Sequence, residues 1–269
     1  MKLCLCFHCL CESYEDITGD SGELYVSLDD MRGMIEQFLD RGYRFTDLED
    51  PADKTVTITF DDGYANNQLF SGLAQEYNIP YIVFVSAYYT QTGEGFPWMK
   101  TASQCYDDMY RFDYYSHHSG RGEGAVVTPD TSPARPITYE ELATMNSSDL
   151  MEIGCHGYYH QPLSKEYEEY TEPERSQSMA VFGDHLGVKP RYYALANGMY
   201  TGRVVRELLQ NFSKVLTIDG TAYRPKDKVV HRLSLTSPNA SAPLMDQVDK
   251  SMRFLRQVKR AFRTRRRLI

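Results

Sequence analysis

Two pairs of residues in this 269-residue chain have the composition of a site for a divalent cation. Asp61 and Asp62 are adjacent, and His156 and His160 are four positions apart. Of two neighbouring carboxylates, one can bind a cation while the other stays free as a general base. Two histidines at positions i and i+4 can reach one metal if the segment between them makes a single helical turn. One aspartate and two histidines would leave a coordination position open for water or a substrate oxygen.

Each pair directly follows a predicted β-strand. Residues 54–60 (KTVTITF) end at Asp61, and residues 150–155 (LMEIGC) end at His156. In parallel α/β folds, catalytic groups gather where strands end. Each pair also has a plainer interpretation, because Asp-Asp-Gly is a good turn sequence and a pair of histidines can be merely solvated or hydrogen-bonded.

Strands and helices alternate along the chain, which predicts an α/β fold with parallel strands. Seven or eight strands fit either a barrel or an open doubly wound sheet. Strands are expected at 2–10, 54–60, 81–85, 150–155, 191–195, 215–218 and 229–235, and helices at 27–41, 66–77, 138–145, 171–186 and 202–210. Residues 91–136 interrupt this order with a long excursion, which we expect beside the active face. We assign residues 1–243 to one domain and residues 244–269 to a basic amphipathic helix.

Composition favours a soluble globular protein, with 42% hydrophobic and 25% charged residues. No segment approaches the roughly 20 apolar residues of a membrane-spanning helix. The first ten residues lack the features of a secretory signal, so we expect a cytoplasmic protein. The six cysteines are interpreted as reduced and packed, with metal or redox chemistry as the alternative.

Charge is distributed unevenly. Residues 250–269 carry nine basic and no acidic side chains, although the net charge of the whole chain is −8, so the rest of the chain carries a balance of −17. An acidic body argues against nucleic acid as a partner. The basic helix could lie on an anionic membrane surface, because Met252, Leu255, Val258 and Phe262 recur near helical spacing. The alternative is a helix that docks on the domain.

Two segments resemble known family motifs. TVTITFDDGYANNQLF…YNIPYIVFV and GCHGYYHQPLS look like the first and second motifs of the polysaccharide deacetylases, the NodB-homology group called carbohydrate esterase family 4. The resemblance implies a distorted (β/α) barrel of seven or so parallel strands that removes N- or O-acetyl groups from sugars. It also implies that Asp61 is the general base, and that Asp62, His156 and His160 bind a divalent metal ion, usually zinc though other divalent ions occur.

The sequence departs from the common pattern in its third motif and in its proton donor. Residues 193–198 (YALANG) lack the arginine that normally orients the base, and Arg191 is either its substitute or a surface residue. The segment HRLSL (231–235) resembles the ending of a subgroup in which the acid histidine comes from the first strand. By that resemblance, His8 in LCLCFHCL is the general acid; otherwise it is a core histidine.

The resemblance implies an acetylated sugar or glycan as substrate, such as a lipid-linked or nucleotide-linked precursor. We expect substrate contacts from Tyr64, Asn197 and Trp98, with Tyr88, Tyr89 and the tyrosines of 106–115 as further candidates for a sugar-stacking rim. Two other functions stay open. One is hydrolysis of a different amide, such as a formamide or a small cyclic amide, and the other is non-catalytic glycan binding.

Overall fold

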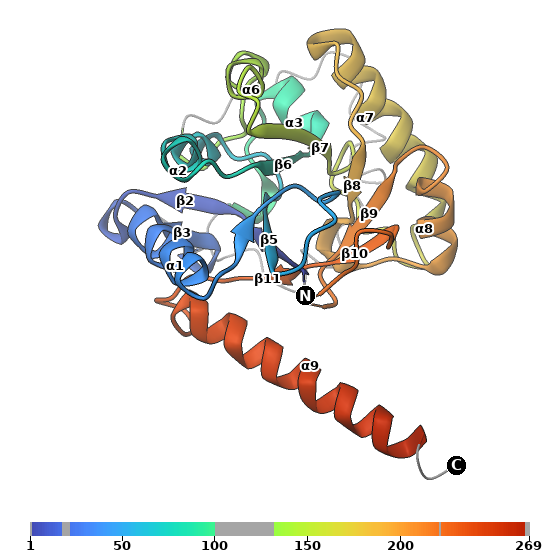
Figure 1. Cartoon of the computed structure of the whole chain (residues 1–269). Coiled ribbons are helices and arrows are strands. Elements are labelled where there is room, and N and C mark those ends of the chain that lie inside the picture. Colours follow the sequence, from blue (N-terminus) through green and yellow to red (C-terminus); the bar gives the residue numbers. More distant parts are fainter. Residues whose placement is uncertain (1, 18–21, 100–131, 221, 267–269) are drawn as a thin grey trace.

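The computed structural model describes residues 2–17, 22–99, 132–220 and 222–266. The tyrosines of 106–115, Cys105 and most of the predicted excursion at 91–136 lie outside the described residues. In the parts that are described, helices surround a central sheet (Figure 1).

The central sheet is built from parallel strands and is nearly closed into a barrel. Its strands follow the order β10-β9-β8-β7-β6-β5-β1-β11, with β4 also paired to β5. Their bounds are β1 Lys2–Phe7, β4 Arg44–Phe45, β5 Thr55–Phe60, β6 Tyr81–Val85, β7 Met151–Cys155, β8 Tyr192–Ala194, β9 Lys214–Thr217, β10 Val229–His231 and β11 Leu233–Ser234. The two end strands, β10 and β11, are separated in the chain by Arg232 alone. This architecture confirms the α/β barrel and excludes the open sheet.

The predicted helices are present. They are α1 Leu28–Asp40, α2 Phe70–Tyr77, α6 Tyr139–Asn146, α7 Thr171–Leu186, α8 Gly202–Leu208 and α9 Leu244–Arg266, together with the short α3 Ala87–Thr92. Helix α1 begins where the Ser27 hydroxyl accepts from the Asp30 N–H, and it buries Met31, Met34, Ile35 and Phe38 on one face. The helix predicted at 66–77 differs at its start, because Ala65–Leu69 is a 3₁₀ turn. Further 3₁₀ turns span Tyr14–Asp16, Gly22–Leu24, Pro97–Met99, Glu168–Tyr170 and Ala196–Gly198.

Two predicted strands are interrupted. The segment 2–10 breaks at His8, and its second part, β2 (Cys9–Cys11), leaves the barrel to pair with β3 (Tyr25–Ser27). The break is held by two asparagine side chains: Asn67 Nδ2 donates to the His8 carbonyl at 2.6 Å, and Asn66 Oδ1 accepts from the Leu10 N–H at 3.1 Å. The segment 229–235 breaks in the same way at Arg232.

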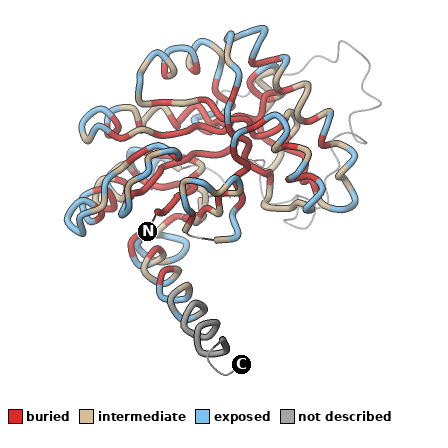
Figure 2. The backbone as a smooth tube through the Cα atoms, turned by 45° about the vertical axis from the view of Figure 1, so that its right-hand side comes forward, coloured by how far each residue is buried: buried red, intermediate tan, exposed pale blue. Residues whose placement is uncertain are grey.

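The strands form the buried centre of the molecule (Figure 2). Every residue of β1, β5 and β6 is buried, as expected for parallel strands covered on both faces. Among the described residues, Cys4, Cys6, Cys9, Cys11 and Cys155 are all free and buried. That placement agrees with the interpretation of these five cysteines as reduced and packed.

Helix α9 docks on the barrel with its first turns and then extends away from it (Figure 1). Leu244, Met245, Val248 and Met252 are buried, and Asp249 forms a two-point ion pair with Arg41 at the end of α1, at 2.7 and 3.1 Å. No described helix is long and apolar enough to span a membrane. Whether the distal part of α9 contacts a membrane stays a prediction.

Candidate active site

Strands β5 and β7 bring the two predicted pairs together at their carboxyl ends. His156 Nε2 lies 3.3 Å from Asp62 Oδ1, and His160 Nε2 lies 3.2 Å from the same oxygen. His156 Nε2 is also 3.8 Å from Asp61 Oδ2. All four side chains are buried. Residues about 95 positions apart in the chain therefore form one cluster.

The backbone after β5 turns sharply, which sends the two aspartates in different directions. The Asp61 N–H still bonds to the Phe7 carbonyl of β1, at 2.9 Å, so Asp61 ends the strand. Asp62 and Gly63 then both adopt positive φ, 73° and 87°. Aspartate enters this region more readily than most residues, and glycine is favoured at position 63 both by its positive φ and because a Cβ would lie 3.1 Å from Val85 Cγ1 and 3.3 Å from Val85 Cα. The Asp-Asp-Gly sequence is thus a turn and a pair of site residues at once.

The loop that carries the two histidines is not the helical turn that the i, i+4 spacing suggested. Residues 156–160 lie outside any helix, and Gly157 and His160 have φ values of 83° and 61°. The histidine rings still meet, with centroids 4.7 Å apart. Two left-handed residues, rather than a helix, fold the loop back so that both imidazoles face Asp62.

The cluster fits a divalent cation. His156 Nδ1 lies 2.9 Å from the Ala194 carbonyl, so in the neutral imidazole this nitrogen carries the proton and Nε2 presents a lone pair toward Asp62. Asp62 Oδ1 is buried and has no hydrogen-bond donor among the described residues. In the absence of a cation, imidazoles that carry a proton toward Asp62 hold the pKa of this carboxyl well below its ordinary value, although burial alone would raise it. A buried, ionised oxygen facing two imidazole nitrogens is a three-ligand set typical of catalytic zinc.

Asp61 is held by Arg232, a residue of the segment HRLSL for which the sequence predicted no role. The fully buried guanidinium donates to both carboxylate oxygens, Nη1 to Oδ1 at 2.6 Å and Nη2 to Oδ2 at 2.7 Å. Burial favours the neutral acid, but Arg232 and His156 outweigh it and lower the pKa of Asp61 to about 2. Asp61 is therefore ionised and neutralised by Arg232, whereas Asp62 is left for a cation.

Arg191 does not orient Asp61. Its guanidinium pairs with Glu152 at 2.8 and 2.7 Å on the outside of the barrel, and 55% of its side chain is exposed. It is a surface residue, the second of the two possibilities that the sequence left open. In the segment 193–198, the Ala194 carbonyl bonds to His156 Nδ1 at 2.9 Å.

His8 lies beside Asp61 at the break between β1 and β2. Its imidazole, the Asp61 carboxylate and the Cys6 thiol present ligand atoms within 4.8 Å of one another, and His8 is half-buried. The Cys6 thiol lies 3.3 Å from Asp61 Oδ2, and burial raises its pKa well above the ordinary value, so it remains a protonated donor. The structure thus places His8 at the site rather than in the core, as a general acid requires; its role stays a prediction.

The three predicted substrate residues have different positions. Tyr64 is fully buried, and its hydroxyl accepts from Trp98 Nε1 at 2.7 Å, so it supports Trp98 from beneath. Trp98 is half-buried, and its ring lies 4.4 Å from that of His160. Asn197 is half-buried in the turn after β8, with φ of 53°. Of the further rim candidates, Tyr88 is half-buried and Tyr89 is buried.

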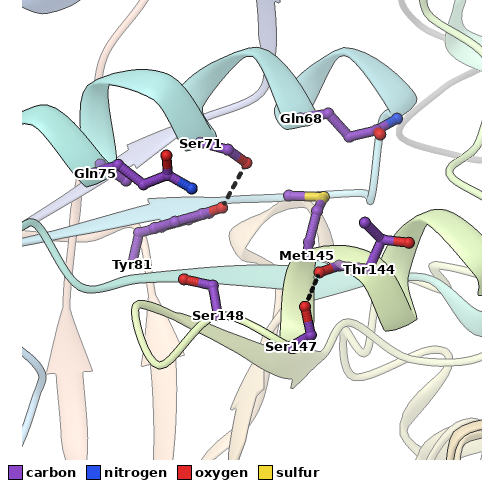
Figure 3. A pocket seen from close by; sticks show the side chains of 9 residues that line it. Gln68, Ser71, Gln75, Tyr81, Thr144, Met145, Ser147 and Ser148 are labelled. Carbon is purple, nitrogen blue, oxygen red and sulfur yellow. Dashed lines mark hydrogen bonds between the residues drawn. The ribbon is translucent and has the colours of Figure 1, made fainter.

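A separate cavity of about 400 Å³ lies between α2 and α6 (Figure 3). It is lined by amide and hydroxyl side chains with one methionine, and the Ser71 and Tyr81 hydroxyls bond to each other at 3.2 Å. None of the aspartates or histidines described above lines it. The chemistry therefore belongs to the strand-end cluster and not to this cavity.

Comparisons with known proteins agree with this geometry. The family model described as polysaccharide deacetylase matches residues 49–212, which include both site motifs. Three solved structures are similar to the chain: IcaB from Ammonifex degensii (20% identity, TM-score 0.64, 89% of this chain and 93% of that one), a de-N-acetylase from Aggregatibacter actinomycetemcomitans (16%, 0.63, 86% and 94%) and the Streptococcus pyogenes deacetylase PplD in complex with acetate (17%, 0.62, 93% and 96%). At these identities the likeness shows the fold. No curated protein sequence matches the chain significantly.

Proposed function

The chain belongs to the polysaccharide deacetylase family, and from this membership we propose that it is a metal-dependent hydrolase that removes an N-acetyl or O-acetyl group from a carbohydrate. The single observation that carries the metal dependence is the buried, donor-free Asp62 Oδ1 facing two imidazole nitrogens. We propose zinc as the ion, because two histidines and one carboxylate are a ligand set that zinc takes in hydrolases.

The residues around the cluster divide the work of amide hydrolysis. Asp62, His156 and His160 would hold the cation, which when bound would polarise the acetyl carbonyl and acidify water. Asp61, kept ionised and oriented by Arg232, would accept the proton of the attacking water. His8, beside Asp61, would donate a proton to the departing amine. Trp98 would line the approach beside His160.

The substrate class is proposed as an acetylated glycan or glycan precursor. We propose a cytoplasmic location, supported by five free, buried cysteines, which are typical of a reducing compartment. We further propose that the basic distal part of α9 contacts anionic lipid. Full-length protein should then cosediment with phosphatidylglycerol vesicles, in a salt-dependent way, and not with phosphatidylcholine vesicles.

The test of the catalytic proposal is Asp61→Asn in zinc-loaded protein supplied with N-acetylglucosamine oligomers. We expect acetate release to be abolished while one zinc ion stays bound, because Asp61 is not among the three ligands. Asp149→Asn, on the exposed turn before β7, is the matched control and should retain full activity. Activity of Asp61→Asn close to that of the native protein would remove Asp61 as the base.

The same assay separates the two alternatives. Release of formate but not acetate from matched substrates would indicate a different amide substrate. Zinc retention with measurable sugar binding and no release of either acid would indicate a non-catalytic glycan-binding protein.

A further inference from the structure

Glu174 is a buried carboxylate that no sequence motif indicates and that takes no part in the proposed reaction. It lies on the first turn of α7 and is 0% exposed. A buried negative charge is strongly unfavourable unless hydrogen bonds compensate for it. Its partners therefore indicate what this residue does.

The carboxylate accepts from three backbone amides of the loop that carries the two histidines. Tyr158 N–H and Tyr159 N–H donate at 2.9 Å each, to Oε2 and Oε1, and Gln161 N–H donates to Oε2 at 3.3 Å. These amides lie between His156 and His160 and just beyond His160. Backbone N–H groups that converge in this way form an anion-binding concavity, and here the anion is a side chain of the protein itself.

The loop needs this support because its backbone is strained. His160 has φ of 61°, although it lacks the conformational freedom that glycine has in this region. A non-glycine residue in the left-handed region costs on the order of 1–3 kcal/mol and persists only where its surroundings fix it. Gly157 has φ of 83°, and a Cβ there would lie 2.2 Å from Glu174 Oε2. The glycine and the carboxylate are therefore packed against each other.

We propose that Glu174 is a positioning residue for the metal site: it fixes the 156–160 loop in the conformation in which both imidazoles face Asp62. A cation that enters the site then finds the Nε2 atoms of both imidazoles already oriented for coordination. This inference rests on the metal site of the proposed function, but it does not depend on the substrate or on turnover.

The test is the zinc dissociation constant of Glu174→Gln, measured without substrate by competition with a chromophoric chelator. Glutamine preserves the volume but turns one acceptor into an NH₂ group that faces backbone N–H donors. We expect zinc to bind about tenfold to a hundredfold more weakly, as for other residues that orient metal ligands. Glu172→Gln is the matched control, because Glu172 is 59% exposed and bonds to Arg175 at 3.0 Å; its zinc affinity should equal that of the native protein.

An unchanged zinc affinity in folded Glu174→Gln would overturn the proposal, whether or not the protein is a deacetylase. If the variant does not fold, amide hydrogen exchange of the native apoprotein tests whether Glu174 fixes the loop. The Tyr158, Tyr159 and Gln161 amides should exchange slowly, like those of β7, if Glu174 fixes the loop. Rapid exchange of these three amides beside a protected β7 would overturn the proposal as well.

Discussion

The ion pair between Arg232 and Asp61 allows the sharpest prediction. We expect Arg232→Met, which keeps most of the side-chain volume, to remove the two donors that hold the Asp61 carboxylate at 2.6 and 2.7 Å. Arg232 also donates to Thr59 Oγ1 at 3.0 Å. Methionine replaces none of these bonds, so Asp61 would be left as a buried charge without its partner.

The loss of unfolding free energy in Arg232→Met can be derived from the burial of Asp61 and from its pKa. Its pKa of about 2, against 3.8 for a free side chain, corresponds to about 2 kcal/mol of stabilisation at neutral pH. Because the folded pKa is lowered, this contribution is complete above pH 4 and is lost as the pH falls toward 2. Without Arg232, burial would raise the pKa instead, so the loss at pH 7 exceeds this figure. We expect about 3–5 kcal/mol, the usual effect of removing one partner of a buried pair.

The assay is urea denaturation of the apoprotein at pH 7 and at pH 3. Arg191→Met is the matched control: its guanidinium also makes two bonds to a carboxylate, that of Glu152, but on the surface, where such pairs contribute about 0.2–1 kcal/mol. The difference in unfolding free energy between Arg232→Met and native protein should be large at pH 7 and smaller at pH 3. Equal losses for the two variants at pH 7 would refute the assignment of Arg232 as the residue that holds the base.

Three further predictions concern the proton donor and the metal ligand. His8→Ala should lower kcat on N-acetylated sugars by about a hundredfold or more, yet change hydrolysis of an aryl acetate little, because a phenolate departs without a proton; parallel losses on both substrates would contradict a role as acid. Asn67→Ala should leave the His8 carbonyl unpaired, lower the unfolding free energy by about 1–3 kcal/mol in urea, and reduce amide more than ester hydrolysis. Asp62→Asn should weaken zinc binding measured by chelator competition and should also lower the apoprotein's unfolding free energy at pH 7, because the two imidazoles hold the pKa of Asp62 well below its ordinary value and so stabilise the ionised carboxylate in the folded state; an apoprotein of equal or greater stability would count against this view of Asp62.

Most of the architecture could be predicted because it depends on local patterns. Residues 54–60 and 81–85 are β-branched and aromatic, and both segments form buried strands. The two pairs Asp61–Asp62 and His156…His160 could be predicted as site residues because each pair begins directly after a strand, β5 or β7. Parallel strands bring their carboxyl ends to one face, so position along the chain already implied proximity in space.

The residues that support the site could not be found in this way. Glu174 lies within TEPERS, which has the composition of an exposed helix start, and only the fold shows that it points into a ring of loop amides. Arg232 is 171 positions from Asp61, and no periodicity connects the two. The spacing of His156 and His160 could be satisfied by a helical turn, and the structure instead brings the rings together through positive φ at Gly157 and His160, because the spacing of two histidines does not determine the backbone conformation between them.

Both strand interruptions fall on residues beside Asp61, and the closure of the barrel explains why. Residues of an unbroken strand alternate between the two faces of the sheet. Where a strand is interrupted, the next side chain is free of this alternation and can point across the end of the barrel. At Arg232 the backbone N–H bonds to the Thr217 carbonyl of β9, and three residues later the Leu235 N–H bonds to the Cys6 carbonyl of β1. The chain therefore joins the two edges of the sheet at Arg232, and the same step delivers the guanidinium to Asp61. Arg232 thus links the closure of the barrel to the orientation of Asp61, so we expect the two to be lost together on unfolding.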